Sequence, residues 1–284
     1  MKKLLCFFIT LTLFISSAKA QKVYSSQNDS LTFKRFVFAM QSKKKLPTGR
    51  LMVETAKWFL GSPYVASTLE KEPEGLVVNL QEFDCMTFVE SVTALVRTLQ
   101  CHKPSFDSYL HNLQSIRYRN GIINNYTDRL HYTSDWIFEN QRRGFVKDVS
   151  QMIGGIVIPF NLSFMSTHPA SYHQLNTNSA FVTVVASKEK EISQRHYYFI
   201  PEEQIEQHQS GIKDGDIIGF VTSVAGLDIS HVAIAYHLGE KLTFIHASSA
   251  LKKVVVNESS LVEYLKDIKH DIGVVIVRPL GNRR

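Results

Sequence analysis

Three residues far apart in the chain, Cys85, His231 and His246, have the types that thiol-based hydrolysis requires. A cysteine becomes a strong nucleophile when a histidine acts as its base and a third polar group orients that histidine. Asp84 precedes a run whose apolar residues are spaced by three and four, which predicts a helix with Asp84 as its N-cap. Cys85 would then occupy the first helical position, where free backbone N–H groups favour a thiolate. The same position suits a small hydrophobe in a core helix, so this stretch alone leaves both interpretations open.

The two histidines lie in a segment, 231–246, that predicts a β-hairpin turning at Gly239-Glu240. Side chains alternate along strands, so His231 and His246 share a face as diagonal neighbours, roughly 7–8 Å apart at the backbone. Alanines between them leave this face shallow, and a helix could pack closely on it. His231 alone fits a structural role as well as a catalytic one, and a histidine such as His246 alone is more often structural than catalytic.

Residues 1–20 have the features of a secretory signal peptide cleaved after Ala20. Lys2 and Lys3 precede an apolar run that is too short to span a membrane. Cleavage removes three lysines and no acid, so the formal charge falls from +6 to +3. This modest charge gives little support for a nucleic-acid partner, whereas an anionic polymer outside the cytoplasm stays compatible with it. We predict an exported, periplasmic protein without stable membrane insertion.

Cys85 and Cys101 are the cysteines of the mature chain, at the two ends of one predicted helix. Sixteen residues of helix span roughly 24 Å, which is far beyond disulfide reach. A free cysteine in an oxidising compartment needs a reason, and reactivity is the obvious one. Zinc bound by Cys85, His231, His246 and Asp84 is the competing interpretation, but no Cys-x-x-Cys or His-x-x-x-His pair prepares a site. We therefore expect no metal and no cofactor.

The remaining elements predict helices early in the chain and strands late. We expect a polar, disordered segment at 21–30, helices at 33–40, 49–60 and 134–143, and strand character at 155–160, 180–186 and 197–200. Short strands are expected at 217–220, 231–237, 242–246, 253–256 and 272–277, with a helix at 261–266. No linker marks a boundary, so we predict one catalytic domain, 21–284, with an insertion at about 101–210.

Several motifs, in this order, resemble the NlpC-type superfamily of papain-like bacterial cell-wall hydrolases. These motifs are Gly61-Ser-Pro-Tyr64, Asp84-Cys85, Gly215-Asp216, Ser230-His231-Val-Ala-Ile and Phe244-Ile-His246. Met-Thr replaces the usual small residues after the cysteine, and the interval from the cysteine to the first histidine is unusually long. Both departures, together with the segment 128–136, are similar to the N-acetylmuramoyl-L-alanine amidase-like branch.

The resemblance implies an α+β, papain-like (NlpC-type) fold, in which N-terminal helices precede a nucleophile helix packed on a central antiparallel sheet. It implies Cys85 as nucleophile, His231 as base and His246 as the group that orients His231. The backbone N–H of Cys85 would contribute to the oxyanion hole, and Tyr64 would lie near the substrate. In endopeptidase members, the aspartate corresponding to Asp84 holds the free amine of the stem peptide. An amidase substrate has that amine acylated, which leaves Asp84 the role of helix cap.

The function implied is an exported cysteine amidase that hydrolyses the N-acetylmuramoyl-L-alanine bond of peptidoglycan fragments (muropeptides), including anhydro-ended ones. Arg129, His131, Tyr132 and Trp136 are candidates for sugar or stem-peptide contacts, although a packed insert with solvated arginines explains them equally well. The alternatives are a stem-peptide endopeptidase, a catalytically idle peptidoglycan-binding module and an enzyme of acyl transfer to or from lipid. The sequence leaves the oligomeric state open.

Overall fold

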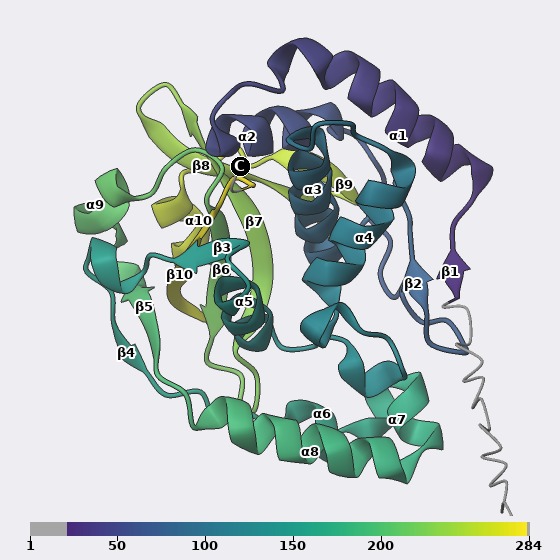
Figure 1. Ribbon diagram of the computed structural model, residues 1–284. Helices are drawn as coiled ribbons and strands as arrows, with labels where there is room; N and C mark the ends of the chain where they lie inside the picture. Colours follow the sequence, from purple (N-terminus) through teal and green to yellow (C-terminus); the bar gives the residue numbers. More distant parts are fainter. Residues whose placement is uncertain (1–21, 283–284) are drawn as a thin grey trace, which may run out of the picture.

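The computed structural model describes residues 22–282 and shows a mixed α+β protein with an antiparallel sheet at its centre (Figure 1). The predicted signal peptide lies outside the described residues. No helix within 22–282 is both long enough and apolar enough to cross a membrane. The elements expected after residue 211 are all present, because their β-branched and aromatic runs are separated by clear turn residues.

The central sheet has the strand order β4-β5-β10-β6-β7-β8-β9, and β3 also pairs with β10. All of its pairs are antiparallel. Its strands are β3 (Val146–Asp148), β4 (Ile156–Ile158), β5 (Tyr197–Pro201), β6 (Ile217–Thr222), β7 (Ile229–Leu238), β8 (Lys241–Ser248), β9 (Lys253–Val256) and β10 (Asp271–Pro279). The region 101–210 therefore contributes strands β3, β4 and β5 to the central sheet. A separate parallel pair joins β1 (Val23–Tyr24) to β2 (Leu76–Val77).

Helices cover both faces of the sheet. They are α1 (Gln27–Met40), α2 (Thr48–Trp58), α3 (Cys85–Leu99), α4 (Phe106–Arg117), α5 (Thr133–Arg142), α6 (Phe164–Thr167), α7 (His173–Thr177), α8 (Ser179–Ser193), α9 (Ile205–His208) and α10 (Leu261–Asp267). On one face, α3 packs on β7 and β8 through a core that includes Val232 and Ile234. On the other, α10 packs on Ala233, Ala235 and Phe244. The expected packing of the helix that begins at Cys85 on an antiparallel sheet is confirmed, and the helix on the shallow alanine face is α10.

Two local predictions are wrong. The segment 21–30 contains β1 and the start of α1, because Ser26 and Asp29 form a capping box that begins the helix early. The segment 180–186 lies in α8 rather than in a strand. Its Phe-Val-Thr-Val-Val run has high strand propensity, but Asn178 caps a helix there by accepting from the N–H groups of Ala180 and Phe181.

Candidate active site

The start of α3 fixes the position of Cys85. The Asp84 carboxylate accepts a hydrogen bond from the Thr87 backbone N–H at 2.7 Å, and the Asp84 N–H donates to the Thr87 hydroxyl at 2.9 Å. This capping box leaves Cys85 as the first helical residue, as the sequence predicts. Thr87 replaces the small residue that the resemblance leads one to expect, and its hydroxyl completes the cap. Asp84 therefore acts as a structural cap in this protein.

The strands β7 and β8 separate where the two histidines lie. Their ladder runs from the turn, where Leu238 pairs with Lys241, only as far as Ile234 and Ile245. On its other edge β8 pairs with β9, with His246 opposite Val255, and on its other edge β7 pairs with β6, with Val232 opposite Gly219. The N-terminal end of α3 packs near this point, and the Val232 N–H lies close enough to the Cys85 sulfur to favour its charged form.

The two imidazoles contact each other directly. His231 Nε2 and His246 Nδ1 are 2.7 Å apart, and the rings are nearly perpendicular, with centroids 4.9 Å apart. The predicted register of β7 against β8 is confirmed, as is the prediction that His231 and His246 share one face. The hydrogen bond uses one nitrogen of each ring, so Nδ1 of His231 stays available for proton transfer. In the described part of the chain, no hydrogen bond joins the Cys85 sulfur to either ring; the thiol instead lies beside Val232, the residue after His231.

Burial governs the protonation of this group. It raises the pKa of Cys85 to about 12, the nearby Asp84 charge adds to the rise, and N–H groups of Val232, Met86 and Cys85 itself oppose it. Burial and the neighbouring His246 lower the pKa of His231 to about 3, and burial lowers that of His246 to about 4. The expectation that the helix start favours a thiolate is therefore wrong for the resting protein, because desolvation outweighs the three N–H groups. A neutral thiol rests beside neutral imidazoles.

Tyr64 is held beside the nucleophile by hydrogen bonds on both sides of its loop. Its N–H donates to the Lys252 carbonyl at 2.9 Å, and the following residue, Val65, donates to the Phe83 carbonyl at 2.9 Å. Burial raises the pKa of Tyr64, and the charges of Cys85 and Asp84 raise it further, which places its phenol close to both groups. Tyr64 thus lies beside Cys85, and its role toward a substrate stays a prediction.

Sequence reasoning missed Tyr264 of α10, which closes the other side of the histidine pair. Its ring centroid lies 6.2 Å from that of His246 and 4.9 Å from that of Phe244. Burial raises the pKa of Tyr264, followed by the charges of Asp271 and Cys85. The sequence predicts the helix α10. No local sequence signal shows, however, that Tyr264 faces Cys85, which lies far earlier in the chain.

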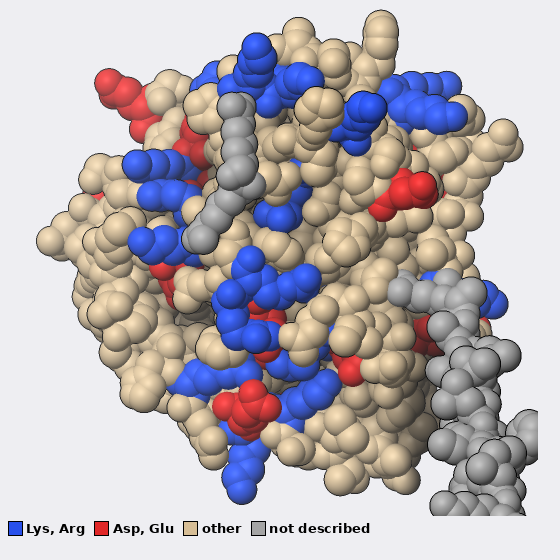
Figure 2. Space-filling view, viewed as in Figure 1, with Lys and Arg blue, Asp and Glu red and all other residues tan. Residues whose placement is uncertain are grey.

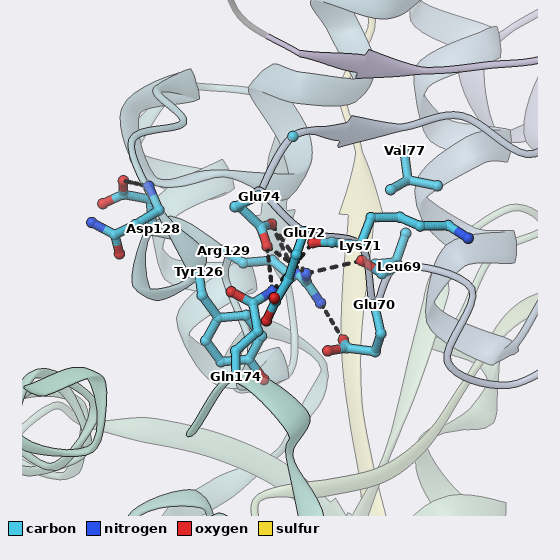
Figure 3. A network of polar contacts seen from close by, with 12 residues as sticks. Leu69, Glu70, Lys71, Glu72, Glu74, Val77, Tyr126, Asp128, Arg129 and Gln174 are labelled. Atoms are coloured by element: carbon cyan, nitrogen blue, oxygen red, sulfur yellow. Dashed lines mark hydrogen bonds and ion pairs between the residues drawn. The ribbon is translucent and has the colours of Figure 1, made fainter. Parts of the chain in front are cut away.

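Arg129 lies in a network of buried ion pairs rather than beside Cys85 (Figure 3). Its guanidinium donates to Glu74 at 2.9 Å and to Glu70 at 2.7 Å, and it lies over the Tyr126 ring. The side chains of Arg129 and Glu74 are only 7% and 3% exposed. These contacts tie the loop before β2 to the region after α4.

The neighbouring candidates are also engaged within the protein. His131 Nε2 lies 2.9 Å from the Tyr126 carbonyl oxygen, and burial, followed by the Arg129 charge, lowers its pKa to about 3. The Tyr132 hydroxyl donates to Glu189 at 2.6 Å, and Trp136 is buried. The structure does not bring these three residues or Arg129 to the thiol and the histidines, and their contacts are those of a packed insert.

Among the residues in 22–282, no group of three or more histidine, cysteine or acidic side chains is arranged to hold a metal ion. Cys85 and Cys101 are both free thiols.

Comparison with known proteins identifies the family to which this chain belongs. The model of the N-acetylmuramoyl-L-alanine amidase-like family matches residues 54–274, and the chain belongs to this family. A solved N-acetylmuramoyl-L-alanine amidase from Bacteroides uniformis is 39% identical, with a TM-score of 0.79, over 82% of this chain and 98% of that one. A Bacteroides fragilis structure described as a proposed xylanase is 38% identical, with a TM-score of 0.76, over 79% and 99% of the two chains. Comparison with curated proteins gives no match.

A third structure, protein LPG0564 from Legionella pneumophila, is 21% identical and has a TM-score of 0.69 over 89% of this chain and 95% of that one. This likeness shows a shared fold.

The thiol's protonation can be measured directly. In the Cys101→Ser variant of the mature chain, we expect the rate of Cys85 alkylation by iodoacetamide to rise about tenfold per pH unit from pH 6 to pH 9, because the thiolate fraction grows by that factor below a raised pKa. Mass spectrometry of the alkylated protein gives the rate, and the Cys85→Ala, Cys101→Ser double variant gives the background. A rate that is already constant below pH 7 would instead indicate a preformed thiolate–imidazolium pair.

The Arg129 network predicts a loss of stability. Arg129→Met leaves the buried Glu74 without its ion pair, so we expect the free energy of unfolding to fall by about 3–5 kcal/mol in urea denaturation. Arg35→Met, at an exposed position on α1, is the matched control and should change it by less than about 0.5 kcal/mol. Unchanged stability in Arg129→Met, with substrate affinity lost, would restore Arg129 as a substrate contact.

Proposed function

We propose that this protein is an exported cysteine amidase that hydrolyses the bond between N-acetylmuramic acid and L-alanine in peptidoglycan fragments. The observation that carries the proposal is the His231–His246 pair, whose ring nitrogens lie 2.7 Å apart on the two strands that pack against α3, the helix that begins at Cys85. Family membership and the named amidase from Bacteroides uniformis support the choice of bond. Kinship with NlpC-type papain-like enzymes, export to the periplasm and small soluble muropeptides as substrates belong to the same proposal.

In the mechanism, Cys85 Sγ attacks the lactyl carbonyl carbon and its proton passes to His231 Nδ1. The backbone N–H of Cys85 and the Tyr64 hydroxyl stabilise the oxyanion. Protonated His231 then gives its proton to the departing L-alanine nitrogen, the C–N bond breaks, and a thioester remains on Cys85. A water molecule, deprotonated by His231, attacks the thioester and releases the muramyl carboxylate. His246 holds His231 through the 2.7 Å hydrogen bond and so keeps Nδ1 directed at the reaction.

Neutral resting groups suit this order of steps. The pKa of the Cys85 thiol is raised and that of the His231 imidazole is lowered, so the proton moves between them only when the substrate is in place. The negative charge that forms then lies on the substrate oxygen, where the oxyanion hole stabilises it. The role of Asp84 as helix cap requires no contact with the substrate. This agrees with an amidase substrate, in which the stem-peptide amine that endopeptidases bind is acylated.

Glycoside hydrolysis, which the description of the Bacteroides fragilis structure would imply, fits this site poorly. That reaction uses a pair of carboxylic acids on either side of the scissile bond. Here the side chains grouped around the sulfur are imidazoles and phenols, and the nearby carboxylate of Asp84 is occupied in the helix cap.

The direct test is product analysis. The mature protein is incubated with a disaccharide-tetrapeptide muropeptide, and the products are identified by mass spectrometry. We expect intact tetrapeptide and free disaccharide, with the rate falling at least about 10³-fold in Cys85→Ala and in His231→Ala. Cys101→Ala is the matched control and should keep the wild-type rate, since Cys101 lies at the other end of α3.

Three outcomes would contradict the proposal. A cut within the peptide would identify a stem-peptide endopeptidase and would return Asp84 to amine recognition. Binding without cleavage would identify a peptidoglycan-binding module. Full activity in Cys85→Ala would exclude the thioester mechanism.

A further inference from the structure

A cavity of about 870 Å³ lies at the far end of α3, away from Cys85. Its wall comes from the segment before α2, the last turn of α3, the end of α5 and the C-terminal end of the described chain. The basic residues that line it are Lys44, Lys45, Arg97, His102, Arg142 and Arg143. Figure 2 shows blue Lys and Arg side chains gathered on the face that carries the end of the described chain. Cavities of roughly 300–1,000 Å³ are the size in which proteins bind small molecules.

Two arginines form a structured part of this wall. The guanidinium carbons of Arg97 and Arg143 lie 3.8 Å and 4.7 Å from the centroid of the same ring, that of Phe145. Stacking on an aromatic ring holds a guanidinium flat and leaves its N–H groups free at the edge. Both arginines are partly buried, and Arg143 donates one further hydrogen bond, to the Ser115 carbonyl.

These two charges lack acidic partners. Within residues 22–282, neither Arg97 nor Arg143 has an ion pair, and no aspartate or glutamate lines the cavity. The buried Nε–H of Arg97 has no hydrogen-bond acceptor among the described residues. Glu139, whose charge acts on Arg143, forms its ion pairs with Arg119 and Arg142. Burial, and repulsion from Arg143, lower the pKa of Arg97 to about 10.

Two other arginines, whose side chains are buried, do have acidic partners. Arg117 and Arg129 are each neutralised by buried glutamates at 2.6–2.9 Å. A cavity that holds two cations on one aromatic ring without an ion pair to any residue in 22–282 lowers its energy by taking up a multiply charged anion. Phosphate fits better than a single carboxylate, since two planar guanidinium groups and two lysines can share its several oxygens.

We propose that this cavity is a binding site for a phosphate or pyrophosphate group carried by a larger molecule, with Arg97 and Arg143 as its principal ligands. The site is separate from the amidase chemistry. Arg97 follows Cys85 by twelve residues of helix, or roughly 18 Å. The volume exceeds what one phosphate fills, which leaves room for the group that carries it.

Calorimetry with inorganic pyrophosphate on the mature protein tests the proposal. We expect saturable binding that weakens as salt rises, since the attraction is between charges. Arg143→Gln should weaken it by about tenfold or more, which is the effect of losing a charge-assisted hydrogen bond. Lys45→Gln, at an exposed position on the rim, cannot disturb the fold and should weaken binding by up to about fivefold. Arg35→Gln removes the same charge from exposed α1 and should bind as the wild type does.

Thiol labelling places the ligand independently of any activity. Cys101 lines the cavity, so in the Cys85→Ala background pyrophosphate should slow its labelling by a maleimide. Absence of binding, equal binding by wild type and Arg143→Gln, or labelling that pyrophosphate leaves unchanged would overturn the proposal. Citrate binding more tightly than pyrophosphate would also overturn it, because the ligand class would then be a polycarboxylate.

Vesicles of phosphatidylglycerol distinguish the two sources of the phosphate. Sedimentation with the vesicles that is lost in Arg143→Gln would assign the phosphate to a lipid headgroup. Pyrophosphate binding without sedimentation would assign it to a soluble phosphate ester.

Discussion

The site depends on one constraint: the first turn of α3 lies where β7 and β8 stop pairing. An antiparallel ladder that continued to His231 and His246 would use the Val232 N–H within the sheet. Because the β7–β8 ladder ends at Ile234 and Ile245, β8 does not use that N–H, which lies near the Cys85 sulfur. The capping box at Asp84 holds the helix end in place, and the loop of Tyr64 is hydrogen-bonded between Lys252 and Phe83. Each group of the candidate site is thus positioned by backbone pairing as well as by side-chain packing.

This arrangement also explains how residues on opposite faces of a sheet share one site. Cys85 belongs to the core that contains Val232, whereas the histidines contact Phe220, Phe244 and Tyr264 on the α10 face. A continuous sheet would separate these two groups. The end of the β7–β8 ladder lets Cys85 approach the strand edge from one face of the sheet while the imidazoles lie on the other.

Much of this could be predicted from the sequence, because it rests on local signals. Asp84 as a cap, the turn at Gly239-Glu240 and the resulting register of His231 and His246 each depend on a few neighbouring residues. The protonation of Cys85 could not be predicted, since helix-start position and burial act in opposite directions and only the packed structure decides between them. Tyr264 and the separation of β7 from β8 depend on long-range packing. The prediction of a strand at 180–186 is wrong because it rested on strand propensity alone and did not consider the helix cap that Asn178 provides.

The two ends of α3 favour charges of opposite sign. At its start, the positive end of the helix dipole faces the Cys85 thiol, and burial lowers the pKa of the nearby His231. At its end, the negative end of the dipole favours cations, and Arg97 in the last turn adds to the group around Phe145. The dipole offsets only part of the repulsion between Arg97 and Arg143, because it corresponds to about half an elementary charge. The remaining charge must be balanced by solvent or by a bound anion, and the aromatic support favours an anion because it holds the guanidinium groups ready to bind.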